Sequence, residues 1–332
     1  MASQYDISTK TQPDNVGLTV SLLPRGASIA GISLQRGDVE REVVLGYPSA
    51  TDYVSDPFYM GSTVGPVANR LRNGRFSIAG ESFAIDINEI ERSNVLHGGR
   101  NGLHQRGFQA STSRDYRSIE FSLTLSHLED GFPGDRTLTV RYTLTDTLSL
   151  QIDFIAKSDR TTIMNLANHA YFNLGGALSD HELKVNADMF SEVDERLLPT
   201  GALHSVIESP LDFMDWRRLD GVAIDQSFVL NADSALRHAA SLRLASSDLQ
   251  LDLFTSQPAL QIYTGDGLSA PFQPRAGVYL EAQGFPDAPN DTVAPTIELA
   301  PGQLYHQRTV YRFGHITETG IPFADATFTD AT

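Results

Sequence analysis

Hydrophobic and polar residues alternate with a period of two along much of the chain. The stretch SIEFSLTLS (residues 118–126) has an apolar residue at every second position, and RTLTVRYTLT (136–145) and LSLQIDF (148–154) repeat the pattern. Successive side chains of a β-strand point to opposite faces, so each stretch predicts a strand with one buried face. Burial on one face only is typical of antiparallel sheets that cover a core.

Short turns separate neighbouring predicted strands. The last two of these stretches are joined by a turn around Asp146-Thr147, which predicts a hairpin. The segment GRFSIAGESFAIDI (residues 74–87) predicts an earlier hairpin that turns at residues 79–82.

Helical periodicity is scarce by comparison. The best helical candidate, SALRHAASLRLAS (residues 234–246), is short. Many strands, few helices and frequent glycine and proline predict an all-β chain, either a large, mainly antiparallel β-sandwich or a barrel. We find no internal repeat and no Pro/Ser-rich linker, and therefore expect residues 1–332 to form a single domain.

The charge balance narrows the possible partners. The chain has 332 residues and a net charge of −16, and its only lysines are Lys10, Lys157 and Lys184. A chain with no basic stripe is poorly suited to bind nucleic acid or an anionic membrane. A neutral small molecule is a better match, and we expect neither nucleic acid nor membrane as a partner.

The absence of cysteine excludes disulfides, cysteine-based zinc sites and a cysteine nucleophile. The N-terminal stretch MASQYDISTKTQPDN lacks the apolar region of a secretory signal, and no apolar run approaches the length of a membrane span. We therefore expect a cytoplasmic protein.

Three segments combine small residues with groups that bind ligands or transfer protons. GPVANRLRNGRF contains Asn69 and Arg70, NVLHGGRNGLHQRGF contains His97, and NLANHAYFNL contains His169. An arginine fork can hold two oxygens at once, whereas HGGRNG lacks the Gly-Lys-Ser/Thr ending of a phosphate loop. Each segment also has an ordinary structural interpretation: a surface arginine in a turn, a tight turn with an incidental histidine, and a buried histidine satisfied by its neighbours.

Two carboxylates in apolar surroundings favour the functional interpretation of these segments over the ordinary structural one. Glu281 interrupts the apolar strand of GVYLEAQGFPDAPN, and Asp225 lies between apolar residues in GVAIDQSFVL. A carboxylate in such a place needs a partner or a chemical task. Histidine is a usable acid near neutrality, and a glutamate with a raised pKa can serve as a base. Together with one or two histidines and Arg70, these carboxylates can move protons on a hydroxylated ligand.

Seven motifs, in this order, resemble those of the aldose 1-epimerase (galactose mutarotase) family: ANRLRNGRF, NVLHGG, NLANHAYFNL, VDERLLPTG, AIDQSFVL, QIYTGDGL and VYLEAQGFPDAPN. They span roughly residues 60–295. The resemblance implies a large, mainly antiparallel β-sandwich of the galactose mutarotase type. It also implies an isomerase that interconverts the α and β anomers of a free aldohexose such as galactose or glucose, with no metal and no cofactor.

The resemblance further implies a role for each candidate residue. His169 matches the family's general acid, which protonates the ring oxygen of the sugar. Glu281 matches the general base, which removes the proton from the anomeric hydroxyl. The residues expected to bind the sugar are Asn69, Arg70, His97 and Asp225. Ring opening of a hemiacetal needs one acid and one base, which agrees with this assignment.

Several neighbours of these groups have expected supporting roles. An aromatic wall suits the C–H face of a sugar, and Phe108, Tyr171 and Phe285 are the candidates. We expect Asn165 and Asn168 to fix the loop around His169 and to orient its imidazole.

Three alternatives remain open from the sequence. A related enzyme that acts on a hexose 6-phosphate would need a cationic cluster, for which several arginines are available. A non-catalytic sugar-binding sandwich would be expected to lose the acid or the base, and both are present. A glycoside hydrolase normally uses two carboxylates, which a histidine–glutamate pair does not match. The chain is expected to be a monomer or a homodimer.

Overall fold

The computed structural model describes residues 3–11, 15–146, 148–231, 236–244, 246–247 and 249–315. Two positions named above, Thr147 in the predicted turn and Ser234 at the start of the predicted helix, lie outside these residues.

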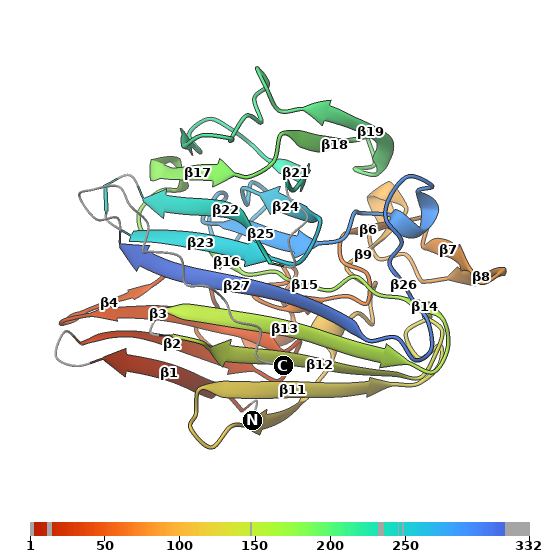
Figure 1. Cartoon of the computed structure of the whole chain (residues 1–332), viewed down its shortest axis with the longest axis horizontal. Helices are drawn as coiled ribbons and strands as arrows, with labels where there is room; N and C mark the ends of the chain where they lie inside the picture. Colours follow the sequence, from red (N-terminus) through yellow and green to blue (C-terminus); the bar gives the residue numbers. More distant parts are fainter. Residues whose placement is uncertain are drawn as a thin grey trace.

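Three antiparallel sheets make up most of the fold (Figure 1). The four-stranded sheet contains, in spatial order, β1 (Tyr5–Thr11), β2 (Val16–Leu23), β3 (Ser28–Arg36) and β4 (Val39–Glu42). The nine-stranded sheet contains β10 (Gln109–Thr112), β11 (Ser118–Leu125), β12 (Arg136–Leu144), β13 (Ser149–Ser158), β27 (Tyr305–His315), β23 (Leu249–Thr255), β22 (Arg237–Leu244), β17 (His181–Val185) and β20 (Arg217–Arg218). The six-stranded sheet contains β16 (Tyr171–Phe172), β25 (Val278–Gln283), β24 (Ala259–Tyr263), β21 (Asp225–Val229), β18 (Met189–Val193) and β19 (Pro199–Ser205).

Smaller elements complete the described structure. Four two-stranded pairs are β14 (Thr162–Ile163) with β26 (Glu298–Leu299), β15 (Ala167–Asn168) with β5 (Thr63–Val64), β6 (Arg70–Arg72) with β9 (Asn94–Leu96), and β7 (Arg75–Ile78) with β8 (Glu81–Ala84). The helical elements of the described residues are all short 3-10 turns: η1 (Asp52–Val54), η2 (Ile90–Arg92), η3 (Leu103–Gln105), η4 (Leu178–Asp180) and η5 (Ala288–Asn290). Over the same residues, no helix has the length and apolar character needed to cross a membrane.

One large hydrophobic core connects the three sheets. It combines apolar residues of β11, β12, β13, β22, β23 and β27 with those of β1–β3 on one side and of β24 and β25 on the other. In β12 the alternation seen in the sequence is reproduced, since Leu138, Val140, Tyr142 and Leu144 are buried and the residues between them are partly or fully exposed. The all-β, mainly antiparallel sandwich expected from the sequence is therefore confirmed.

Both predicted hairpins are present. Strands β12 and β13 pair over their full length, and β7 pairs with β8. The second hairpin turns at Ala79 and Gly80, which have φ values of 50° and 82°. Two consecutive residues with positive φ are the conformation that a tight two-residue hairpin turn requires.

The helix predicted at residues 234–246 is wrong over residues 236–244, which the structure describes. Residues 237–244 form β22, which is hydrogen-bonded to β17 on one edge and to β23 on the other. Ala240, Leu242 and Leu244 belong to the core at every second position. The alanine and leucine content raises the helix propensity of this segment, but pairing on both edges outweighs that preference.

Candidate active site

Asn69, Arg70 and His97 come from one small two-stranded ribbon. Arg70 begins β6 and lies opposite Leu96 of β9, and His97 follows that strand directly. Asn69 and His97 both have left-handed backbones, with φ of 62° and 52°. Such a conformation is uncommon in residues other than glycine and often marks a functional site.

A pair of hydrogen bonds fixes His97 against Asn69. The His97 amide donates to the Asn69 carbonyl oxygen over 3.0 Å, and the Asn69 amide donates to His97 Nδ1 over 3.2 Å. Because Nδ1 accepts a hydrogen bond, the neutral imidazole carries its proton on Nε2. His97 is thus presented as a hydrogen-bond donor, which suits an oxygen of a sugar.

The glycines after His97 serve the packing of the backbone. Gly98 and Gly99 have φ of 81° and 83°, and a Cβ at Gly98 would collide with the carbonyl oxygen of Gly65. Glycine adopts this positive φ without steric cost at both positions. The close approach at Gly98 is to another part of the chain.

His169 lies in the short link between β15 and β16. Its amide donates to the Ser62 carbonyl oxygen, and its carbonyl oxygen accepts from the Gly61 amide, over 2.9 and 3.1 Å. Strand β15 is paired with β5 and β16 with β25, so the backbone of His169 is held on both sides. This pairing places the imidazole beside β25, which carries Glu281.

The two asparagines near His169 hold the surrounding backbone. Asn165 forms two hydrogen bonds with Gly284, at 3.3 and 2.7 Å, one as donor and one as acceptor. Asn168 donates to the Gly61 carbonyl oxygen and accepts from the Ala170 amide. The side chains thus brace the loop as expected, whereas neither is hydrogen-bonded to the imidazole ring among the described contacts.

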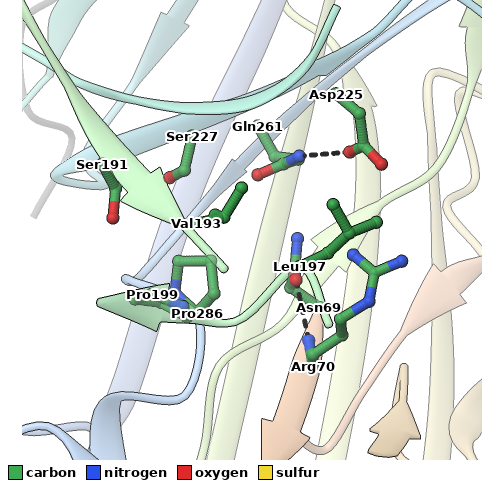
Figure 2. Close-up of a pocket in the computed structure, with 10 residues that line it drawn as sticks. All are labelled: Asn69, Arg70, Ser191, Val193, Leu197, Pro199, Asp225, Ser227, Gln261 and Pro286. Carbon is green, nitrogen blue, oxygen red and sulfur yellow. Dashed lines mark hydrogen bonds between the residues drawn. The ribbon is translucent and has the colours of Figure 1, made fainter. Parts of the chain in front are cut away.

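Glu281 and Asp225 are connected through the strand between them. Glu281 of β25 lies opposite Gln261 of β24, and Asp225 begins β21 on the other side of β24. The Gln261 amide donates to Asp225 Oδ1 over 2.8 Å. Gln261 therefore fixes the Asp225 carboxylate, as Figure 2 shows, with strand β24 between Asp225 and Glu281.

The centre of the site is a buried group of three side chains. His97, His169 and Glu281 are 3%, 2% and 0% exposed, and one nitrogen or oxygen of each lies within 4.8 Å of the others. Both carboxylate oxygens of Glu281 and Nδ1 of His169 are buried without a hydrogen-bond partner among the described residues. Buried polar groups are normally paired, so these atoms are available to a ligand.

Three such side chains could also hold a divalent metal ion. A neutral histidine ligates a metal through an unprotonated nitrogen. The amide of Asn69 occupies Nδ1 of His97, so that residue would have to give up either this hydrogen bond or its Nε2 proton. The tautomer therefore favours hydrogen bonding over metal ligation.

Arg70 and Asp225 line the same small cavity, of about 10 Å³ (Figure 2). Its lining residues are Asn69, Arg70, Ser191, Val193, Leu197, Pro199, Asp225, Ser227, Gln261 and Pro286. A volume of this size admits about one water molecule. The cavity brings the predicted sugar-binding residues of β6 and β21 together.

Burial controls the protonation of the central pair. Burial, reinforced by the charge of Asp225, raises the pKa of Glu281 well above its ordinary value, and Arg70 opposes that shift. Burial also lowers the pKa of His169 to about 3, with a smaller contribution from His104. Burial therefore favours the uncharged form of both groups.

The pKa values of two predicted binding residues, His97 and Asp225, are shifted as well. Burial and the neighbouring His169 lower the pKa of His97 well below its usual range, which keeps it neutral. Burial raises the pKa of Asp225, although Arg70 and the hydrogen bond from Gln261 oppose the effect.

Tyrosines form the aromatic surroundings of His169. Its ring centroid lies 4.3 Å from that of Tyr279, 5.2 Å from Tyr171 and 5.6 Å from Tyr59. Tyr171 was expected from the sequence, whereas Tyr59 and Tyr279 were missed. Phe108, another expected wall residue, belongs instead to the main hydrophobic core.

The sequence also gave no reason to select Glu89. This residue forms a salt bridge with Arg70 at 3.0 Å and lies 19 positions away from it. Gln261 and Tyr279 lie inside motifs quoted above, so their motif context was the only available signal. Glu89 has no such signal, because it lies between two motifs.

Comparisons with known proteins give consistent matches over most of the chain. Residues 11–312 match the family model described as aldose 1-epimerase. The chain is 34% identical to an aldose 1-epimerase of Escherichia coli, over 91% of this chain and 94% of the relative. It is 33% identical to a galactose mutarotase of Rattus norvegicus, over 89% and 91% of the two chains.

Solved structures agree as well. A GalM/aldose epimerase homologue from C. elegans superposes with a TM-score of 0.88 at 30% identity, covering 96% of this chain and all of that one. A galactose 1-epimerase from Lactobacillus acidophilus gives 0.81 at 26% identity, covering 95% and 99%. These matches confirm the predicted sandwich type over nearly the whole chain. The chain belongs to the aldose 1-epimerase family.

Proposed function

We propose that this protein interconverts the α and β anomers of a free aldohexose, such as galactose or glucose, with His169 as acid and Glu281 as base. His169 protonates the ring oxygen while Glu281 removes the proton from the anomeric hydroxyl. The ring opens to the aldehyde, the C1–C2 bond rotates, and the two groups exchange roles when the ring closes.

The observation that carries this proposal is the closeness of His169 and Glu281. The ring oxygen and the anomeric hydroxyl are bonded to the same carbon, so the acid and the base that serve them must lie near each other. One atom of each side chain lies within 4.8 Å of the other, and neither Glu281 oxygen has a partner of its own. The sugar supplies the missing hydrogen bonds.

The proton balance is compatible with these roles. An imidazolium and a carboxylate hold the same number of protons as a neutral imidazole and a neutral carboxyl group. Ring opening converts the first pair into the second, since His169 loses a proton to the ring oxygen and Glu281 gains one. Burial favours the second pair, so the hydroxyl groups of the bound sugar must stabilise the charged pair before the ring opens.

The remaining predicted residues bind the sugar in this proposal. Arg70 and Asp225 hold hydroxyl groups as charged donor and acceptor, and His97 donates through Nε2. Asn69 contributes through its backbone, because its amide holds the tautomer of His97.

Polarimetry of freshly dissolved α-galactose and α-glucose tests the proposal. Wild-type protein is expected to accelerate the approach to equilibrium, and Glu281→Gln or His169→Asn to reduce the rate about 10²- to 10⁴-fold. His181→Gln is the matched control, because His181 is fully buried but its ring nitrogens are engaged by the backbone of Leu174 and Ala177. If either site variant equilibrates anomers as fast as wild type, the assignment of that residue is wrong.

The pH dependence provides a second test. The active pair holds one proton, so the rate is expected to fall in acid, where the pair gains a second proton, and in alkali, where it loses the first. The two apparent pKa values belong to the pair as a whole. A rate that is flat from acid to alkaline pH would contradict an acid–base pair.

The environment of the nearby arginines argues against a hexose 6-phosphate as substrate. Arg72 is engaged by Asp287 at 3.2 Å, and Arg106 by Glu129 at 2.7 Å. These two guanidinium groups already have carboxylate partners, which counts against their use in a phosphate site. Turnover of glucose and glucose 6-phosphate, compared in the same assay, is expected to favour the free sugar.

A further inference from the structure

Glu89 holds Arg70 in a two-pronged ion pair beside the proposed sugar site. Both carboxylate oxygens accept from Nε of Arg70, at 3.2 and 3.0 Å, and Nη2 donates to Oε1 over 3.0 Å. The two side chains are only 10% and 12% exposed. Charge-assisted hydrogen bonds of this geometry fix orientation as well as distance.

The hydrogen bonds of the Arg70 guanidinium to described residues all go to Glu89, through Nε and Nη2. The guanidinium lines one cavity with Asp225 (Figure 2). Its charge also acts on Asp225 and on Glu281. Arg70 is thus hydrogen-bonded to Glu89 and interacts with the other two carboxylates through charge alone. Glu281 has two oxygens without partners, so it would be a ready acceptor if Arg70 were released.

Glu89 is itself held in place from several sides. Arg92 Nη1 donates to its Oε1 over 3.1 Å, and Asn94 Nδ2 donates to its Oε2 over 3.2 Å. Backbone hydrogen bonds link Glu89 and Asn94 in both directions, and Arg196 in turn binds the Asn94 side-chain oxygen. The carboxylate thus cannot follow Arg70 towards the sugar.

We infer that Glu89 is a positioning residue for the anomer interconversion: it turns Nη1 of Arg70 towards the sugar and keeps the guanidinium from pairing with Glu281. This inference rests on the proposed function of the site. Glu89 does not touch the reacting atoms in this assignment and acts through Arg70 alone.

Because Glu89 sets the position of Arg70, it also affects the pKa of Glu281. With Glu89 in place, part of the Arg70 charge is offset, and burial outweighs the effect of Arg70 and keeps the pKa of Glu281 raised. The titratable or charged groups that face Glu281 are Arg70, His97, His169, Tyr171, Asp225, Tyr279 and Tyr311. Of these, Arg70 is the one whose position depends directly on Glu89.

Glu89→Gln tests the inference by removing one negative charge while keeping the shape of the side chain. The expected result is a fall in kcat/KM of tenfold or more, and a shift of the acidic limb of the pH–rate profile towards lower pH by about one unit, since a nearby opposite charge lowers a carboxyl pKa. Glu91→Gln is the matched control, because Glu91 is exposed and lies two positions further along the same 3-10 turn. Glu89→Asp retains the negative charge and should leave the acidic limb of the pH–rate profile at its wild-type pH.

Two further measurements separate positioning from folding and from the proposed function. In an Arg70→Gln background, Glu89→Gln should add less than a twofold change, because its effect acts through Arg70. The Glu281 carboxyl can be titrated without turnover by infrared spectroscopy, assigned by its loss in Glu281→Gln, and its pKa should fall in Glu89→Gln. Wild-type kinetics in Glu89→Gln, an additive effect in the double variant, or an unchanged Glu281 titration would each overturn the inference. A wild-type protein that accelerates no free aldose would instead overturn the proposed function.

Discussion

Replacement of Glu281 by glutamine should make the protein more stable at neutral pH while removing its proposed base. Glu281 is fully buried, and neither of its oxygens has a hydrogen-bond partner among the described residues. Burial raises its pKa well above its ordinary value of 4.5. Glutamine retains the volume and the unpaired polar group, so the comparison isolates the ionisation.

The direction in which pH changes the free energy of unfolding follows from the number of protons that the folded and unfolded states bind. Between pH 4.5 and the raised pKa of the folded state, the unfolded chain has lost the Glu281 proton and the folded protein retains it. The stabilising contribution of Glu281 to the free energy of unfolding is therefore complete below the unfolded-state pKa. Above that pKa it declines as pH rises, by about 1.4 kcal/mol per pH unit. An unfolding entropy of about 0.7 kcal/mol per kelvin for 332 residues converts this slope to ~2 °C per pH unit.

Thermal unfolding between pH 4 and 8, followed by circular dichroism, provides the assay. The difference in Tm between Glu281→Gln and wild type should be small at pH 4 and should widen by about 2 °C per pH unit above 4.5. Glu81→Gln, at an exposed position of the β7–β8 hairpin, is the control and should show no such widening. A Tm difference that stays constant or narrows with rising pH would refute the reasoning that burial keeps Glu281 protonated in the folded protein.

Two other substitutions test a buried ion pair of the fold and the close backbone packing beside His97. Arg136→Met should lower the free energy of unfolding by about 3–5 kcal/mol in chemical denaturation, since Arg136 and Asp130 form a salt bridge whose side chains are 0% exposed. Arg136→Met combined with Asp130→Asn should recover part of that loss. A loss under about 1 kcal/mol for the single variant would contradict a buried charge. Gly98→Ala should lower the free energy of unfolding by more than about 1 kcal/mol, because φ is +81° and the new methyl group would meet the Gly65 carbonyl oxygen. It should also reduce sugar turnover, because His97 is the neighbouring residue. Unchanged stability would show that the backbone can relax there.

The strands and their buried faces were predictable because alternation is a local property. The faces of β12 and the two hairpins follow directly from period-two patterns and short turns. Strand β22 was not predictable, because its alanines and leucines are consistent with a helix until β17 and β23 bind its two edges. Local propensity is weak compared with two ladders of hydrogen bonds.

For the candidate site too, part of the chemistry was predictable from the sequence and part depended on the tertiary structure. His169, Glu281, Arg70, His97 and Asp225 could be selected from the sequence because each lies in a recognisable motif or in surroundings unusual for its charge. Their shared position in one buried site could not be derived from any single motif, since it depends on the pairing of β15, β16, β24 and β25.

The sequence by itself determined the strand pattern, the family and the residue types that carry the proposed reaction. The tertiary structure decided the protonation and orientation of those residues. The tautomer of His97 depends on the amide of Asn69, 28 positions away, and the direction of Arg70 depends on Glu89. Burial and hydrogen bonding between distant segments set pKa values and side-chain orientation, and neither exists before the chain is folded.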